Sequence, residues 1–263
     1  MAPNLMIYKH SIVTFHDTIP FKCSTKSVKN ILSAILYSFI LEADKFLGTH
    51  FVTVSQDAKK DMCQFVDKFK IAGVIGNGWE HIKDVIVDDS VFERRLDIDR
   101  GQYYLAISSI APHKNFEWII QNAKKNPDVQ YIIVGPKRPN LSTVSTNEFK
   151  DNVIYLGFQS DEVLKALIVN AKALISPSLY EGFGIPPLEA LACGTKVIVS
   201  DIPVYHEIYG DAVAYLNPHD ASLDLDSVDW DKDRSVEIKR VLETYTWKNA
   251  AKKWIDLMER MSK

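Results

Sequence analysis

Short apolar runs, rich in β-branched and aromatic residues, alternate with helical patterns along most of this chain. Such alternation predicts β-α-β units, in which parallel strands are buried between helices on both faces of a sheet. The expected strands are 12–15, 51–54, 73–75, 103–107, 131–134, 153–156, 173–175, 196–199 and 212–216. The expected helices are 27–43, 57–69, 116–125, 160–170, 187–192 and 235–244. The fold class predicted is therefore α/β with parallel sheets.

The expected strands are too many for one doubly wound sheet, and the charged, apolar-poor stretch 84–100 is typical of a joint between sheets. We predict two Rossmann-like lobes, 1–98 and 99–245. The first has three expected strands and lacks an opening strand with a glycine-rich turn, since its earliest glycine is Gly48. We therefore expect this lobe to be incomplete, in a fragment, an internal start or a split subunit.

Composition excludes several other classes of protein. The 263 residues carry a formal net charge of -3, which gives no basic footprint for nucleic acid. Cys23, Cys63 and Cys193 show no metal-ligand spacing and favour a reducing, cytoplasmic compartment. The longest apolar run, 31–41, is shorter than the roughly 20 residues that span a membrane, and there is no signal peptide pattern. Helix 27–43 is expected to pack in a core, the alternative being a partner or membrane surface.

The stretch from Ser176 to Gly194 carries the most chemistry. It follows an expected strand, at the edge of a parallel sheet where ligands bind. Gly182 and Gly184 permit close backbone approach to a ligand, and a helix opened by two prolines would direct its N-terminus at an anion such as a phosphate. Glu181 and Glu189 flank this position and suit sugar or ribose hydroxyls. The alternative is a Gly-Pro loop with two solvated glutamates.

Glu181 and Glu189, separated by seven residues in the frame EGFGIPPLEALACG, resemble the EX7E signature of retaining glycosyltransferases of family 4. That family is also called glycosyl transferases group 1 and has the two-lobed GT-B fold. Further resemblances, in the family's order, cover nearly the whole chain: 13–17, 52–55, 76–78, 107–115, 153–158 and 245–247, the last leading into a helix, 246–263, that crosses back to the first lobe.

The resemblance implies a nucleotide-diphosphate sugar on the second lobe, an acceptor on the first, and a cleft that closes around both. Lys114 would contact the diphosphate, and a solvated lysine is the alternative. Ser109 stands where the family often has arginine. This chain therefore lacks one positively charged side chain that could contact the phosphates. The donor-binding residues implied are Ser109, Lys114, Gly157, Phe158, Glu181, Gly182, Phe183, Gly184 and Glu189. Among these, Glu189 would bind the ribose and Gly157–Phe158 the base.

The catalytic residues implied are His16, Lys114 and Glu181. His16 would contact the transferred sugar, and a structural histidine at a strand end is the alternative. Asp17 is expected to cap a turn. No metal site is expected, because the histidines are scattered, no Asp-x-Asp triplet has a pocket-like context, and the one Asp-Leu-Asp, Asp224 to Asp226, lies in an acidic loop that is expected to be solvated.

The double-proline form of the motif resembles mannosyl- and rhamnosyltransferases of bacterial surface polysaccharide assembly. GDP-mannose or dTDP-rhamnose is therefore expected ahead of a UDP-sugar, with no other cofactor and a saccharide or lipid-linked acceptor at the inner membrane face. An incomplete first lobe implies a homo-oligomer or a partner subunit. The alternative function is a non-catalytic nucleotide-sugar-binding or scaffolding subunit, and a sugar-nucleotide epimerase is disfavoured by the EX7E frame.

Overall fold

The computed structural model describes residues 11–19, 39, 50–65, 71–136 and 151–262. The chain divides into two compact units. Unit 1 comprises Met1–Asn77, Glu181–Phe183 and Trp247–Lys263, and unit 2 comprises Gly78–Tyr180 and Gly184–Thr246. Except for Phe39, the helix expected over 27–43 lies outside the described residues.

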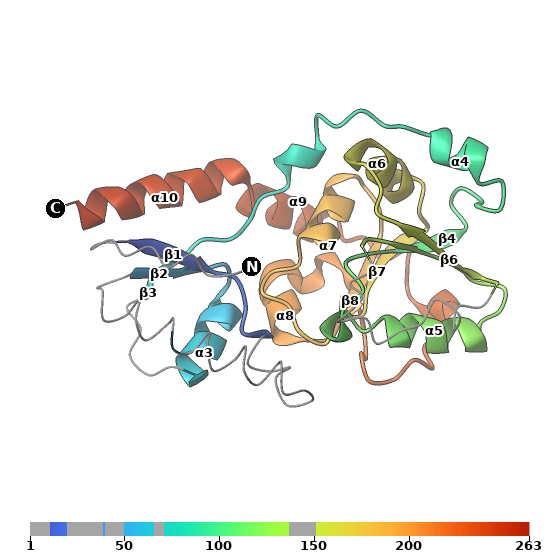
Figure 1. Ribbon diagram of the computed structural model, residues 1–263, viewed down its shortest axis with the longest axis horizontal. Helices are drawn as coiled ribbons and strands as arrows, with labels where there is room; N and C mark the ends of the chain where they lie inside the picture. The colour runs from blue at the N-terminus through green and yellow to red at the C-terminus, as the bar shows by residue number, and fades with distance from the viewer. Residues whose placement is uncertain (1–10, 20–38, 40–49, 66–70, 137–150, 263) are drawn as a thin grey trace. The chain divides into compact units, whose positions relative to one another are not determined.

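Unit 1 contains a three-stranded parallel sheet of order β1-β2-β3 in its described part. Its elements are β1 (Ile12–Phe15), β2 (His50–Thr53), α3 (Gln56–Phe65), β3 (Ile71–Val74) and α10 (Trp247–Met261). Figure 1 shows α3 and α10 on opposite faces of this sheet. Since side chains alternate along a strand, Phe51 packs with Met62 of α3, while Val52 packs with Leu257 of α10. The three strands expected here are confirmed to within two residues.

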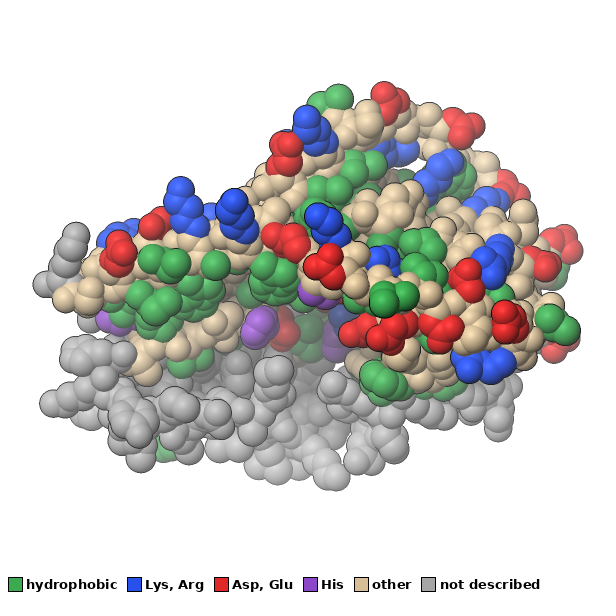
Figure 2. Space-filling model, turned by 90° about the horizontal axis from the view of Figure 1, so that it is seen from above, with side chains coloured by type: hydrophobic (Ala, Val, Ile, Leu, Met, Phe, Trp, Pro, Cys, Tyr) green, Lys and Arg blue, Asp and Glu red, His purple; other side chains and the backbone are tan. Residues whose placement is uncertain are grey.

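The outward face of α10 carries both basic and apolar side chains. Lys248 and Lys252 are exposed, and Ile255 and Met258 are 54% and 51% exposed. In Figure 2 blue and green side chains lie together on α10, at the left of the view. Within the described residues, no helix combines the length and the apolar character needed to cross a membrane.

Unit 2 contains a six-stranded parallel sheet of order β6-β5-β4-β7-β8-β9. Its strands are β4 (Tyr103–Ile107), β5 (Gln130–Val134), β6 (Val153–Gly157), β7 (Ala173–Ser176), β8 (Val197–Ser200) and β9 (Ala214–Leu216). Its helices are α4 (Ser90–Arg94), α5 (Phe116–Lys125), α6 (Asp161–Val169), α7 (Ile185–Ala192), α8 (Pro203–Tyr209) and α9 (Ser235–Thr244). The strand order reverses between β4 and β7, as in a doubly wound sheet. The six expected strands are confirmed.

Both faces of the second sheet are buried, as parallel strands require. Tyr104 and Ala106 of β4 pack with Trp118 of α5 in one core cluster. The next residue along, Tyr103, is also fully buried and donates a hydrogen bond of 2.7 Å to the Leu167 carbonyl of α6. Because helices cover both faces of this sheet, apolar residues follow one another along its strands.

The units divide at Asn77/Gly78, whereas the sequence led us to divide the lobes at residue 98. Segment 79–85 is held to unit 2 by side-chain hydrogen bonds. The Trp79 indole donates to the Leu242 carbonyl of α9 at 2.9 Å, and Lys165 of α6 donates to the Lys83 and Val85 carbonyls at 2.9 and 2.7 Å. These partners are distant in sequence, so a drop in local apolar content does not reveal them.

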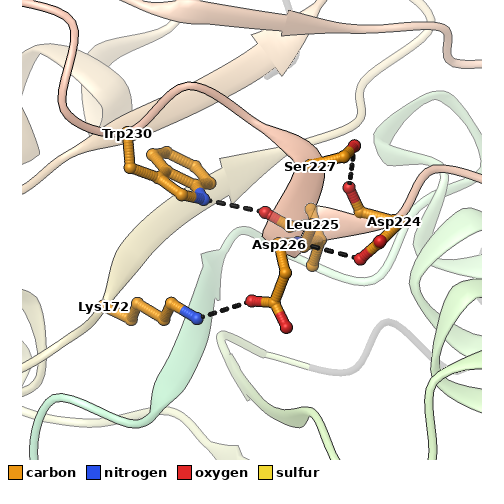
Figure 3. A network of polar contacts seen from close by, with 6 residues as sticks. All are labelled: Lys172, Asp224, Leu225, Asp226, Ser227 and Trp230. Carbon is orange, nitrogen blue, oxygen red and sulfur yellow. Dashed lines mark hydrogen bonds and ion pairs between the residues drawn. The ribbon is translucent and has the colours of Figure 1, made fainter.

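Polar contacts connect the residues of the acidic loop after β9 (Figure 3). Asp226 forms an ion pair of 2.9 Å with Lys172, and Asp224 accepts a hydrogen bond of 2.9 Å from the Asp226 amide. The Trp230 indole donates to the Leu225 carbonyl at 2.8 Å. Both aspartates are exposed, as expected of a solvated loop, and both also take part in these contacts.

Candidate functional site

The loops after β4, β5 and β6 lie against one another at the carboxyl edge of the unit 2 sheet. The Ser108 amide donates to the Val134 carbonyl at 2.9 Å, and the Gly135 amide donates to the Gly157 carbonyl at 2.8 Å. A β-carbon on Gly135 would overlap the Ser108 carbonyl oxygen, so only glycine permits this approach. The structure thus brings together the segments of Ser109 and Gly157. Sequence reasoning missed Gly135, although a glycine directly after a buried strand is a usable signal.

Lys114 lies at the end of a 3-10 helix, Pro112–Lys114, and its side chain is half-buried. This turn is held to the loop after β7, because the Leu179 amide donates to the His113 carbonyl at 2.7 Å. Asn115 adopts a left-handed conformation with a φ of 57°, and its side-chain amide donates to the Pro177 and Pro218 carbonyls at 3.0 and 2.8 Å. The structure therefore brings the predicted phosphate-binding segment to the loop that leads into the glutamate motif.

Gly184 directly precedes α7 as its N-cap residue, and tyrosines of α8 contact it. Its φ of 91° is left-handed, and a β-carbon there would lie 2.5 Å from Tyr205 Cε1. The buried Tyr209 hydroxyl donates a hydrogen bond to the Gly184 carbonyl. The Tyr205 hydroxyl is 2.7 Å from Ser176 Oγ at the end of β7. Two buried tyrosine side chains of α8 thus fix the conformation of the turn before α7.

The sequence did not predict helix α8. Polar and aromatic contacts fix its position next to the turn before α7. His206 Nε2 is 2.6 Å from Asp201 Oδ1, and its ring stacks on Tyr215 with centroids 4.2 Å apart. Burial raises the pKa of Tyr215 to about 12, so its hydroxyl stays neutral and donates to the Gly210 carbonyl at 2.7 Å. At seven residues, α8 is too short to show a clear helical period in the sequence, which explains the omission.

Helix α7 begins at Ile185, two residues earlier than expected. Pro186 and Pro187 therefore occupy its second and third positions, and proline has no N–H group. The start of this helix offers an anion fewer amide donors than a helix without prolines. The amides of Gly182, Phe183 and Gly184, which the resemblance also implies as donor-binding residues, are therefore expected to carry more of the contact with an anion.

Glu189 lies in the second turn of α7, and its side chain is 13% exposed. Its Oε1 is 2.6 Å from His81 Nε2, on the segment that joins the two units. One turn later, burial raises the pKa of the Cys193 thiol, which Lys165 lowers in part, so this cysteine stays protonated at neutral pH. Sequence reasoning missed His81, because nothing local links it to a residue 108 positions away.

The remaining predicted residues belong to unit 1, where Gly182 packs against the end of β1. A β-carbon on Gly182 would overlap the His16 carbonyl oxygen, and Ser55 Oγ donates to the Gly182 carbonyl at 2.7 Å. His16 is exposed and Glu181 half-buried. Asp17 accepts a hydrogen bond of 3.0 Å from the Ile19 amide, as expected for a turn cap. Ser55, fully buried, is a further residue that the predicted site had not included.

The predicted site residues thus fall into two groups. Ser109, Lys114, Gly157 and Gly184 lie at the carboxyl edge of the unit 2 sheet, with the 78% exposed Phe158 after β6 and Glu189 in α7. His16 and Glu181–Phe183 belong to unit 1. In the parts of the chain that the structure describes, no group of three or more His, Cys, Asp or Glu residues is placed to hold a metal ion.

Comparison with known proteins relates the chain to glycosyltransferases. A family model described as glycosyl transferases group 1 matches residues 89–224. The chain is 34% identical over 221 residues to the O-antigen chain mannosyltransferase RfbU of Salmonella typhimurium, covering 81% of this chain and 58% of that protein. It is 28% identical over 250 residues to an uncharacterized glycosyltransferase of Methanocaldococcus jannaschii, covering 82% and 62%. The chain therefore spans about three-fifths of these relatives.

Solved structures of glycosyltransferases share the fold. Anabaena HepE, in complex with UDP and glucose, superposes with a TM-score of 0.74 at 16% identity, covering 95% of this chain and 71% of HepE. Sucrose-phosphate synthase from Thermosynechococcus elongatus superposes with a TM-score of 0.73 at 19% identity, covering 95% and 67%. These likenesses confirm the expected α/β fold of the GT-B type. With the family model matching more than half of its residues, the chain belongs to the glycosyl transferases group 1 family.

Proposed function

We propose that this chain is a glycosyltransferase that moves a sugar, with retention of configuration, from a nucleotide diphosphate to a saccharide or lipid-linked acceptor in surface polysaccharide biosynthesis. The observation that carries the proposal is the carboxyl edge of unit 2. There the Gly135 contact and the Asn115 hydrogen bonds hold the Ser109–Lys114 segment beside the loop that leads into Glu189. Preorganised donors of this kind stabilise charge that develops on a leaving group.

In this proposal each residue keeps its predicted role. The half-buried Lys114 balances the charge of the departing diphosphate, and amides of Gly182 to Gly184 bind the sugar and phosphate. Glu189 accepts hydrogen bonds from the ribose, Gly157–Phe158 contacts the base, and Ser109 lies beside the phosphates. His16 and Glu181 face the transferred sugar. No step requires a metal ion.

The relatives favour mannose as the sugar. RfbU and the serotype-specific WbdA of Escherichia coli are both named mannosyltransferases. We therefore rank GDP-mannose first, dTDP-rhamnose second and UDP-sugars third. Three further points stay predictions. They are the identity of the acceptor, the formation of a homo-oligomer or a complex with a partner subunit, and a cytoplasmic location at the inner membrane face.

Ser109 favours a second candidate function. Because serine is uncharged, Lys114 is the one predicted cation for the diphosphate. A single cation would suit a subunit that binds nucleotide sugar without transferring it.

Calorimetric titration of the chain with GDP, UDP and dTDP tests nucleotide binding. One nucleotide should bind, and Lys114→Ala should weaken its binding about tenfold or more, because a charge-assisted contact to phosphate is lost. Lys124→Ala, on the exposed side of α5, is the matched control and should bind as the wild type does. Absence of binding to all three nucleotides would contradict the proposal.

Release of nucleotide from the bound sugar conjugate, with and without a lipid-linked saccharide acceptor, then separates the two functions. Acceptor-dependent release supports the transferase. Tight binding with no release under any acceptor condition supports the non-catalytic subunit.

A further inference from the structure

His81 lies opposite Glu189, the carboxylate that we expect to bind ribose hydroxyls. The two side chains are 2.6 Å apart at Nε2 and Oε1, and they are 44% and 13% exposed. An ionised carboxylate only accepts hydrogen bonds, so Nε2 carries the proton of this bond. The imidazole is therefore a donor to a largely buried carboxylate of the predicted site.

The backbone on both sides of His81 is anchored independently of this bond. Trp79 donates to the Leu242 carbonyl on one side, and the Lys83 and Val85 carbonyls accept from Lys165 on the other. Ile82, next to His81, is buried at 4% exposure. The position of the His81 backbone beside α7 therefore does not depend on the bond to Glu189.

Glu189 gains a fixed orientation from this partner. A glutamate has three rotatable side-chain bonds, and a hydrogen bond to one oxygen restricts all of them. The bond from His81 uses one acceptor position of Oε1, and an ionised carboxylate has about four such positions. Oε2 and the remaining position on Oε1 are thus still able to accept from two vicinal hydroxyls.

We propose that His81 is a positioning residue, which holds the Glu189 carboxylate in the orientation that accepts hydrogen bonds from the ribose hydroxyls of a nucleoside diphosphate. The inference rests on the proposed function and assigns a role to the segment that joins the two units. A pair in which one partner is 44% exposed contributes little to stability. Effects on ligand affinity and on folding can therefore be separated.

The test is calorimetric titration of the full chain with GDP and with 2′,3′-dideoxy-GDP, repeated with UDP and its dideoxy form. His81→Ala should weaken binding of the ribonucleotide about tenfold, the loss expected for one hydrogen bond that involves a charge. It should leave binding of the dideoxy nucleotide and the thermal midpoint unchanged. His81→Gln, whose amide also donates, should recover most of the lost affinity. In a Glu189→Ala background, His81→Ala should have no further effect.

Three results would overturn the inference. If His81→Ala binds the ribonucleotide as tightly as the wild type, which itself discriminates against the dideoxy form, the positioning role is wrong and the proposed function stands. If His81→Ala loses the same affinity for both forms, the histidine acts on the structure in general. If the wild type binds neither nucleotide in either form, the inference fails together with the nucleotide site.

Discussion

At the scale of single residues, the candidate site depends on backbone positions where a side chain does not fit. Gly135 meets the Ser108 carbonyl, and Gly184 meets the ring of Tyr205. Both glycines also have a positive φ, of 141° and 91°. Each contact brings two segments of unit 2 closer than a β-carbon permits, so these glycines shape the loops that carry the predicted ligand-binding residues.

Gly135→Ala should destabilise the protein by about 3 kcal/mol, because the β-carbon must displace the Ser108 backbone and φ is strained as well. The same displacement moves Ser109, so nucleotide affinity should also fall. Urea denaturation and calorimetric titration measure the two effects.

Gly194→Ala is the matched control. Its φ of 79° is also positive, but no atom lies within 4 Å of the added carbon, so about 1 kcal/mol is expected. Equal losses for the two variants would show that the contact with Ser108 is unimportant.

At the scale of elements, one asparagine connects three loops of unit 2. Asn115 ends the 3-10 helix of Lys114, precedes α5, and donates to carbonyls after β7 and β9. Asparagine tolerates the left-handed region better than most residues, because its short polar side chain hydrogen-bonds locally. Here the conformation and the two hydrogen bonds together set the position of the predicted phosphate-binding segment.

Replacement of Asn115 should be worse with alanine than with glycine, although alanine is the better helix former. Asn115→Gly should cost about 2 kcal/mol through the lost hydrogen bonds, and Asn115→Ala about 1 kcal/mol more through left-handed strain. Denaturant unfolding gives both values. At Asn170, which caps α6 with a φ of -100°, alanine should be no worse than glycine. The same order at both positions would contradict the assignment.

At the scale of the whole molecule, the two units have separate cores. The unit 1 sheet is covered by α10, which follows the last helix of unit 2 in the sequence. Leu257 and Ala250 of α10 pack with Val52 and Ile75. Burial of one face of the unit 1 sheet therefore depends on α10.

Leu257→Ala should destabilise unit 1 by about 2–5 kcal/mol, because it leaves a cavity under a helix that covers one sheet face. Hydrogen exchange should become faster in β2, β3 and α10 and stay unchanged in β4 and β5, which belong to unit 2. Ile255→Ala, on the same helix but 54% exposed, should change neither. Equal acceleration in both units would mean that they unfold as one.

The sequence by itself determined the α/β class, nine strands to within two residues, and the glutamate frame, which starts after β7 and ends inside α7. These features are local: apolar runs set strands, and glycines, prolines and acids follow one another within twenty residues. Roles for His16, Lys114, Glu181 and Glu189 stay predictions.

Only the tertiary structure decided which distant residues meet. The bond between His81 and Glu189, the hydrogen bonds from Asn115 and the contact of Gly135 with Ser108 all join segments that are distant in the sequence. The Asn77/Gly78 division likewise depends on hydrogen bonds from Trp79 and Lys165 to remote partners. Periodicity encodes which face of an element is buried, whereas pairing across the sheet edge depends on strand order and helix packing, which no local pattern specifies.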